Sequence, residues 1–109
     1  MEIRPTVGVA GLGRMGQPVA MNILDAGFPT AVWNRTAEKA TGLLERGATW
    51  TETPGALAQT ADIVLSSLAD PDAVESVYFG SDGLLDRARA GTIFIDLSTG
   101  SPATAGTWT

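Results

Sequence analysis

The sequence predicts an α/β fold: a Rossmann-type, doubly wound parallel sheet in a three-layer arrangement, truncated after its fifth strand. Two observations predict it. Short apolar runs alternate along the chain with helix-like stretches, which is typical of βαβ units with helices on both faces of a parallel sheet. The first run is followed directly by Gly11, Gly13 and Gly16, the G-x-G-x-x-G spacing of a dinucleotide-binding turn. The 109 residues are expected to form one domain, residues 1–109.

The first two predicted strands flank a helix. Residues 6–10 form a β-branched run of the kind that a buried parallel strand shows. Residues 15–26 carry apolar side chains at helical spacing, and Gly27 follows them in the position of a C-cap. Residues 30–33 read as the second strand.

The middle of the chain is predicted from its caps. Thr36 is expected to be the N-cap of a helix that ends before Gly47, and residues 48–50 form a weak third strand. Thr53 is expected to cap a further short helix, with Pro54 at its first position, where a missing N–H costs little.

The last predicted elements are two strands with a helix between them. Residues 62–68 are the clearest buried strand, and residues 70–80 form a helix. Residues 81–91 are expected to be a turn with a short helical piece, and residues 92–98 the fifth strand. The helix over residues 70–80 is expected to bury one face, which Val74, Val77 and Tyr78 form.

The composition excludes several classes of function. The net charge of −5 argues against a general affinity for nucleic acid or for anionic membranes. The chain has no cysteine and no histidine, which removes thiolate nucleophiles, imidazole bases, disulfides and the usual zinc ligands, so no metal site is expected. No signal peptide and no apolar run long enough to span a bilayer are found, and a cytoplasmic protein is expected.

Each glycine of the turn has a separate predicted role. Gly11 permits the tight turn, Gly13 lets the backbone approach a pyrophosphate, and Gly16 lets the helix pack closely on the strand. The helix N-terminus then offers unpaired N–H groups and partial positive charge to the phosphates. The alternative is a strand-to-helix turn that needs only flexibility.

The end of the second strand predicts the cofactor. NAD-binding folds usually place an acid there to bind the ribose 2′-hydroxyl, but this chain has Asn34, Arg35 and Thr36, with no acid before Glu38. Arg35 can pair with a 2′-phosphate, and its two neighbours can donate neutral hydrogen bonds. NADP(H) is therefore expected as the cofactor, with NADPH preferred over NADH. Alternatively, Arg35 is a solvated surface residue and Thr36 a plain helix cap.

Four segments together resemble the β-hydroxyacid dehydrogenase family: "GLGRMGQPVAMNIL", "VWNRTAEKA", "DIVLSSLADPDAV" and "GTIFIDLSTGSPA". That family includes 3-hydroxyisobutyrate dehydrogenases, glyoxylate and succinic-semialdehyde reductases and, more distantly, 6-phosphogluconate dehydrogenase. The imine reductases are close relatives with a similar "NRT" segment. The most specific pattern, G-L-G-x-M-G-x-x-x-A-x-N, runs from Gly11 to Asn22.

The resemblance implies further cofactor contacts. A Leu-Pro pair of the family lines the cofactor, and this chain has Leu68 and Ala69 there, while Ala73 replaces a family asparagine. In the segment D-x-S-T-x-x-P, which begins at Asp96, Thr99 is expected near the nicotinamide ribose; alternatively, Asp96 caps a helix and its neighbours satisfy turn amides. The cofactor-binding residues expected in all are Gly11, Leu12, Gly13, Arg14, Met15, Gly16, Asn34, Arg35, Thr36, Leu68, Ala69 and Thr99.

The resemblance also implies what this stretch of sequence lacks. The family's catalytic lysine and its substrate-binding segment belong to positions beyond this chain, whose one lysine, Lys39, follows the NADP-specificity turn. No catalytic residue is therefore assigned, and a small-molecule substrate is expected only with the helical catalytic domain. The chain is expected to bind cofactor without turnover, as part of an oxidoreductase that transfers hydride between nicotinamide and a small hydroxy acid or aldehyde.

Three alternatives stay open at this point. The chain is either the cofactor domain of an NADPH-dependent imine reductase, or a stand-alone NADP(H)-binding module, or a remnant with little cofactor affinity. A sheet that lacks its last strands would expose an apolar edge and surface, which predicts self-association.

Overall fold

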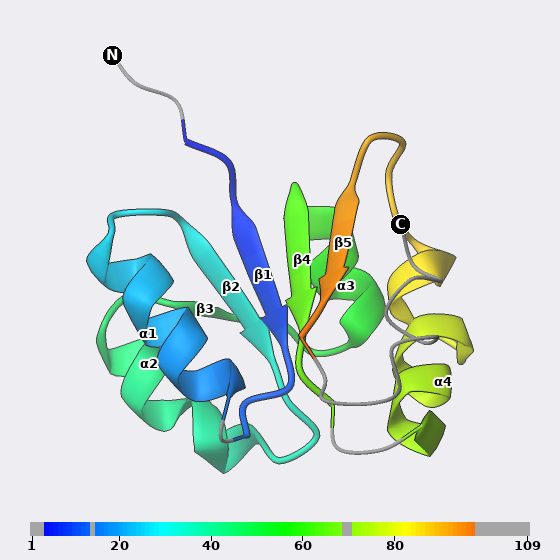
Figure 1. Ribbon diagram of the computed structural model, residues 1–109, viewed down its shortest axis with the longest axis horizontal. Helices are drawn as coiled ribbons and strands as arrows, with labels where there is room; N and C mark the ends of the chain where they lie inside the picture. The colour runs from blue at the N-terminus through cyan, green and yellow to red at the C-terminus, as the bar shows by residue number, and fades with distance from the viewer. Residues whose placement is uncertain (1–3, 14, 69–70, 98–109) are drawn as a thin grey trace.

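The computed structural model describes residues 4–13, 15–68 and 71–97, which form a parallel five-stranded sheet with helices packed on it (Figure 1). The elements follow in the order β1 (Val7–Ala10), α1 (Gly16–Asp25), β2 (Thr30–Trp33), the 3₁₀ helix η1 (Ala37–Ala40), α2 (Thr41–Glu45), β3 (Thr49–Trp50), α3 (Pro54–Thr60), β4 (Ile63–Ser66), α4 (Pro71–Phe79), the 3₁₀ helix η2 (Leu84–Asp86) and β5 (Ile93–Asp96). The predicted fold class is confirmed. None of the helices in these residues is long and apolar enough to cross a membrane.

The strand order is β3-β2-β1-β4-β5, so β1 lies at the centre of the sheet. On one side Ala10 is in register with Trp33 of β2, and on the other with Ser66 of β4. The chain runs outward from β1 to β3 and then crosses back to β4, so the strand order reverses between β1 and β4. In open α/β sheets, ligands bind beyond the carboxyl ends of the strands at such a switch point.

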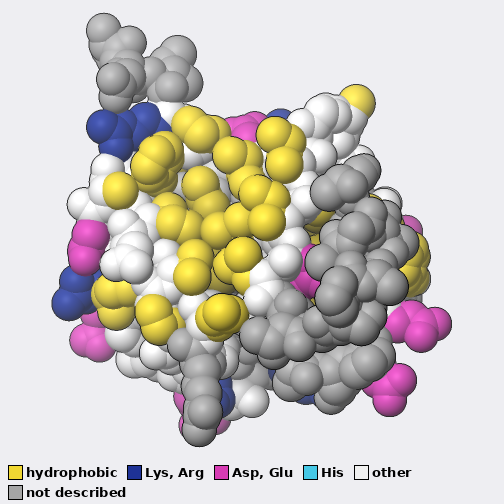
Figure 2. Space-filling view, viewed as in Figure 1, with side chains coloured by type: hydrophobic (Ala, Val, Ile, Leu, Met, Phe, Trp, Pro, Cys, Tyr) yellow, Lys and Arg dark blue, Asp and Glu magenta, His cyan; other side chains and the backbone are white. Residues whose placement is uncertain are grey.

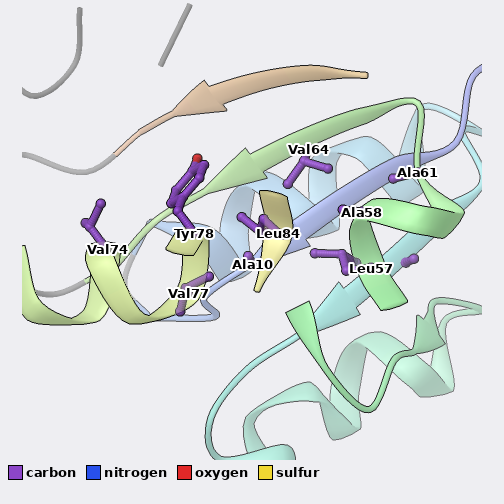
Figure 3. Packing of buried hydrophobic residues seen from close by; sticks show 10 residues of the cluster. Ala10, Leu57, Ala58, Ala61, Val64, Val74, Val77, Tyr78 and Leu84 are labelled. Atoms are coloured by element: carbon purple, nitrogen blue, oxygen red, sulfur yellow. The ribbon is translucent and has the colours of Figure 1, made fainter. Parts of the chain in front are cut away.

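Two separate hydrophobic clusters lie on the two faces of the sheet. On the face covered by α1 and α2, Val9 and Val32 of the sheet pack with Ala20 and Leu43. On the opposite face, α3, α4 and η2 cover the sheet (Figure 1). Figure 3 shows this second cluster, whose labelled members are Ala10, Leu57, Ala58, Ala61, Val64, Val74, Val77, Tyr78 and Leu84. The three layers and the buried face predicted for α4 are thus confirmed.

The predicted helix boundaries hold at two places. Gly27 follows Ala26, the C-cap of α1, and its φ of +92° is the left-handed conformation that favours glycine directly after a helix. Thr53 is the N-cap of α3, and its Oγ1 accepts a hydrogen bond of 3.0 Å from the N–H of Ala56, with Pro54 as the first helical residue.

The single helix predicted after Thr36 is wrong. Thr36 occupies the N-cap position of η1 but makes no side-chain cap hydrogen bond, and a short α2 follows η1. The Thr41 hydroxyl at their junction donates to the carbonyl oxygen of Glu38 (2.9 Å), a side-chain bond that competes with regular helix. Gly42, next in the chain, lowers the helix propensity further, so tertiary contacts decide the local shape.

Among the described residues, no helix covers one part of the sheet. On the α1 side of β4 and β5, Ile63 is in register with Ile93, and Leu65 with Ile95. Ile93 is 53% exposed and Ile95 44% exposed, while their partners in β4 are half-buried. Figure 2 shows hydrophobic side chains gathered over this side of the molecule. We call these four residues the β4–β5 apolar face.

Candidate cofactor-binding site

Gly11, directly after β1, brings the turn against the end of β4. Its φ is +96°, and a Cβ placed on it would lie 2.1 Å from the carbonyl oxygen of Ser67. Its N–H donates to the carbonyl oxygen of Trp33 (2.9 Å), which continues the pairing of β1 with β2 by one residue. The chain itself therefore requires glycine here, both for conformation and for space.

Gly16 begins α1 against the same turn. A Cβ on Gly16 would lie 1.8 Å from the carbonyl oxygen of Gly11, closer than any side chain allows. The residue is buried, so the helix can start close to the strand only because this position has no side chain. This geometry agrees with the packing role predicted for the third glycine.

Gly13 differs from the other two glycines. It is exposed, and apart from its chain neighbours no atom of the described residues lies within 4 Å of the position that its Cβ would occupy. Packing within the described part of the chain therefore does not explain glycine at this position. An open approach to the backbone is what a bound pyrophosphate requires, so the arrangement fits a dinucleotide.

The N-terminus of α1 opens toward this turn with free donors. In the described part of the chain, the N–H groups of Gly13 and Met15 donate to no protein acceptor. Met15 occupies the N-cap position without a side-chain cap bond, and the first turn of α1 holds no acidic residue. The unpaired N–H groups and the helix dipole can therefore act on an anion.

The end of β2 lies beside the turn. Asn34 accepts, through Oδ1, a hydrogen bond of 2.9 Å from the N–H of Leu12, and its Nδ2 donates to the carbonyl oxygen of Thr36 (2.9 Å). Arg35 and Thr36 are exposed, and among the described residues the guanidinium of Arg35 makes no ion pair. The Arg35 guanidinium is thus available beside the glycine turn, while the Asn34 side chain is engaged within the protein.

The end of β4 reaches the same turn from the other side. The N–H of Ser67 donates to the carbonyl oxygen of Ala10 (2.8 Å), and Leu68 Cδ2 lies 3.2 Å from the position of a Cβ on Gly11. Met15, which is also among the expected cofactor contacts, is 47% exposed at the start of α1. The expected site residues that lie outside the described part of the chain are Arg14, Ala69 and Thr99.

A buried polar group at the ends of β4 and β5 was not predicted from the sequence. Oγ of Ser66 lies 2.7 Å from the Tyr78 hydroxyl and donates to Oδ1 of Asp96 at 3.2 Å. Burial raises the pKa of Tyr78, and the Asp96 carboxylate adds to the increase, while the Ser66 hydrogen bond opposes it. A serine that ends an apolar strand, with an aspartate ending the next, was the available signal, but its meaning depends on the register that pairs them.

Comparison with known proteins identifies the family. The sequence model of one protein family, the NAD binding domain of 6-phosphogluconate dehydrogenase, matches residues 6–108 of this chain. The chain belongs to this family. This confirms the resemblance drawn from the four sequence segments, and NAD(P) binding by the domain follows from it.

Individual relatives agree with that assignment. An uncharacterized oxidoreductase, YkwC of Bacillus subtilis, is 41% identical over 103 residues, which are 94% of this chain and 36% of the relative. The structure of Psf3 in complex with NADP+ and 2-OPP is 40% identical, with a TM-score of 0.85 over 92% of this chain and 36% of that one. The chain thus spans about a third of the length of these relatives.

Imine reductases are also structural neighbours. The imine reductase from Myxococcus stipitatus in complex with NADP+ is 32% identical, with a TM-score of 0.85 over 94% of this chain and 35% of that one. A V8 variant of the same enzyme in complex with NAD+ is 28% identical, with a TM-score of 0.84 over 93% and 34% of the two chains. Both dinucleotides therefore occur on this fold among the neighbours.

Proposed function

We propose that this chain is the NADP(H)-binding domain of an oxidoreductase and that it prefers NADPH over NADH. One observation carries the preference: after β2 the chain presents Arg35, an exposed cation, where NAD-binding folds usually place a carboxylate. A carboxylate there would repel a 2′-phosphate, whereas a guanidinium can pair with it through two N–H donors. The NADP+ complexes of two neighbours support this assignment.

In this proposal the pyrophosphate lies at the glycine turn and the N-terminus of α1, with Gly13 giving the open approach. The 2′-phosphate end lies at Asn34–Thr36, and the nicotinamide end lies toward the carboxyl ends of β4 and β5. Besides Gly11, Gly16 and these residues, the proposed cofactor contacts are Leu12, Arg14, Met15, Leu68, Ala69 and Thr99.

The nicotinamide, when bound, supplies hydride transfer to or from a carbon centre of the substrate. We propose a small hydroxy acid or aldehyde as the substrate class of the whole protein, with an imine as the second candidate because imine reductases are structural neighbours. The 109-residue chain is proposed to bind the dinucleotide without turnover, because Lys39, its one lysine, lies in η1 on the 2′-phosphate side of the site. Robust oxidation of NADPH by the purified chain with aldehydes or imines would contradict this part.

The cofactor proposal is tested by titrating the purified chain with NADPH and with NADH, and by measuring binding through intrinsic fluorescence or calorimetry. Wild type is expected to bind NADPH more tightly. Arg35→Ala is expected to weaken NADPH binding by roughly 10- to 150-fold, the equivalent of one charge-assisted contact, with little effect on NADH. Arg87→Ala is the matched control, because Arg87 pairs with Asp82 (2.9 Å) next to η2. Equal loss of both dinucleotides in Arg35→Ala would overturn the preference.

We also propose that the chain self-associates, with a second copy covering the β4–β5 apolar face. Two exposed isoleucines of the edge strand β5, beside an isoleucine and a leucine of β4 that no other described element covers, favour such an association. The cytoplasmic location stays a prediction from the sequence.

A further inference from the structure

Asn34 connects the two parts of the site that the proposed function assigns to different ends of the dinucleotide. Its Oδ1 accepts from the N–H of Leu12 in the glycine turn, and its Nδ2 donates to the carbonyl oxygen of Thr36, both at 2.9 Å. We infer that Asn34 is a positioning residue, which fixes the glycine turn relative to Arg35 and Thr36, rather than a ligand of the 2′-phosphate. The inference rests on the proposed function for the identity of the ligand.

The bond to Leu12 extends the pairing of β1 with β2 beyond the sheet. The last backbone rung joins the N–H of Gly11 to the carbonyl oxygen of Trp33 (2.9 Å). One residue further on, the N–H of Leu12 donates to the carboxamide oxygen of Asn34 rather than to a backbone carbonyl. The turn after β1 and the segment after β2 are thus held together at the point where both leave the sheet.

Leu12 shows why this contact matters. Its side chain is 1% exposed and packs in the α1–α2 cluster, so the residue cannot turn its N–H to solvent without leaving the core. Loss of the Asn34 carboxamide would leave this N–H without its acceptor, which costs more than the net gain from an ordinary hydrogen bond. The turn would then move to satisfy the N–H group, and the neighbouring Gly13 would move with it.

The two possible roles of Asn34 predict different binding patterns. A direct ligand of the 2′-phosphate matters for NADPH alone. A positioning residue matters for every ligand that uses the glycine turn, because NADPH and NADH share the pyrophosphate. The sequence suggested the first role, since a carboxamide can donate to a phosphate, whereas the contacts in the structure favour the second.

The test combines dinucleotide titration with amide hydrogen exchange of the ligand-free chain. Asn34→Ala is expected to weaken NADPH and NADH by a similar factor, about 2- to 13-fold for one lost hydrogen bond. Exchange of the Leu12 amide is expected to become faster in the same variant. Asn34→Asp keeps an oxygen acceptor, so slow Leu12 exchange and NADH binding are expected to return, while NADPH stays weak because the new carboxylate repels its 2′-phosphate.

Loss of NADPH affinity alone in Asn34→Ala, with unchanged Leu12 exchange, would overturn the inference. Wild-type protein gives a check that needs no variant: the Leu12 amide must exchange more slowly than the exposed Gly13 amide, and equal rates would also overturn it. If the wild type binds neither dinucleotide, the proposed function fails. The exchange data still decide the structural role of Asn34, because they are recorded without ligand.

Discussion

The hydroxyl of Tyr78 lies 2.7 Å from Oγ of Ser66, within the cluster shown in Figure 3. Both side chains are fully buried, and Ser66 in turn donates to the carboxylate of Asp96. This chain of hydrogen bonds joins α4 to the carboxyl ends of β4 and β5. It lies at the edge of the sheet where ligands bind in this type of fold.

The first prediction concerns alkaline pH. Burial raises the pKa of Tyr78 above its ordinary value of 10.0, so the folded chain keeps this proton at a pH where the unfolded chain has lost it. The contribution to the free energy of unfolding is complete below pH 10.0 and is lost as the pH rises through the folded pKa. Tyr78→Phe should therefore lose stability less steeply above that pH, and should be less stable by about 1 kcal/mol at neutral pH.

Urea unfolding of both proteins over a pH series measures the difference. Because the chain has one tyrosine, the ultraviolet absorbance of tyrosinate reports the pKa of Tyr78 directly in the wild type. An ordinary tyrosine titration in the folded protein would contradict the prediction.

The three glycines of the turn should separate stability from binding. Gly11→Ala and Gly16→Ala force a Cβ onto backbone atoms and should lower the free energy of unfolding by about 1–3 kcal/mol or more. The methyl group of Gly13→Ala meets no atom of the described residues beyond its chain neighbours, so stability should be unchanged or higher by up to about 1 kcal/mol.

Affinity for both dinucleotides should fall in Gly13→Ala, because the new methyl group occupies the open approach. Thermal unfolding and titration of the same samples measure the two effects. A stable Gly13→Ala variant with wild-type affinity would show that the pyrophosphate does not use this turn.

The cap of α3 gives a local stability test. Thr53→Ala removes the hydroxyl that accepts from the N–H of Ala56 and should destabilise the chain by about 1 kcal/mol. Thr53→Ser keeps the hydroxyl and is the matched control, expected close to wild type in chemical denaturation. Equal losses in the two variants would mean that the methyl group of Thr53, rather than the cap, stabilises the helix.

The β4–β5 apolar face should govern the oligomeric state. Wild type is expected to associate as its concentration rises, and Ile95→Lys should shift it toward monomer by placing a charge in the uncovered face. Leu85→Lys is the control, since Leu85 is similarly exposed (42%) but lies in η2 on the other side of the sheet. If light scattering shows that the wild type is monomeric at high concentration, the proposed association is refuted.

Local signals in the sequence were sufficient for most of the fold. Thr53 and Pro54 predict the start of α3, and Gly27 predicts the end of α1, because each of these residues acts on its immediate neighbours. The helix expected after Thr36 failed because tertiary contacts override a weak propensity there: the Gln17 side chain donates to the carbonyl oxygen of Lys39 (2.7 Å) in η1.

The structure brings several of the expected site residues together beside the glycine turn, but the contacts between them were not predicted from the sequence. The glycine spacing and Arg35 located the turn and the cation. The role of Asn34 depends on a partner 22 residues away, and the bond of Ser66 to Asp96 spans 30 residues. Such pairs form because neighbouring strands align in a particular register, and a single sequence is not enough to predict that register.

The separation of the two hydrophobic clusters has a consequence for how this protein changes over evolutionary time. Val9 of β1 belongs to the cluster under α1 and α2, whereas its neighbour Ala10 belongs to the cluster under α3 and α4. Substitutions in opposite layers that lie more than about 7–10 Å apart and share no partner should act nearly additively. A lineage can therefore accept substitutions in the layer under α1 and α2 with little repacking of the layer under α3 and α4.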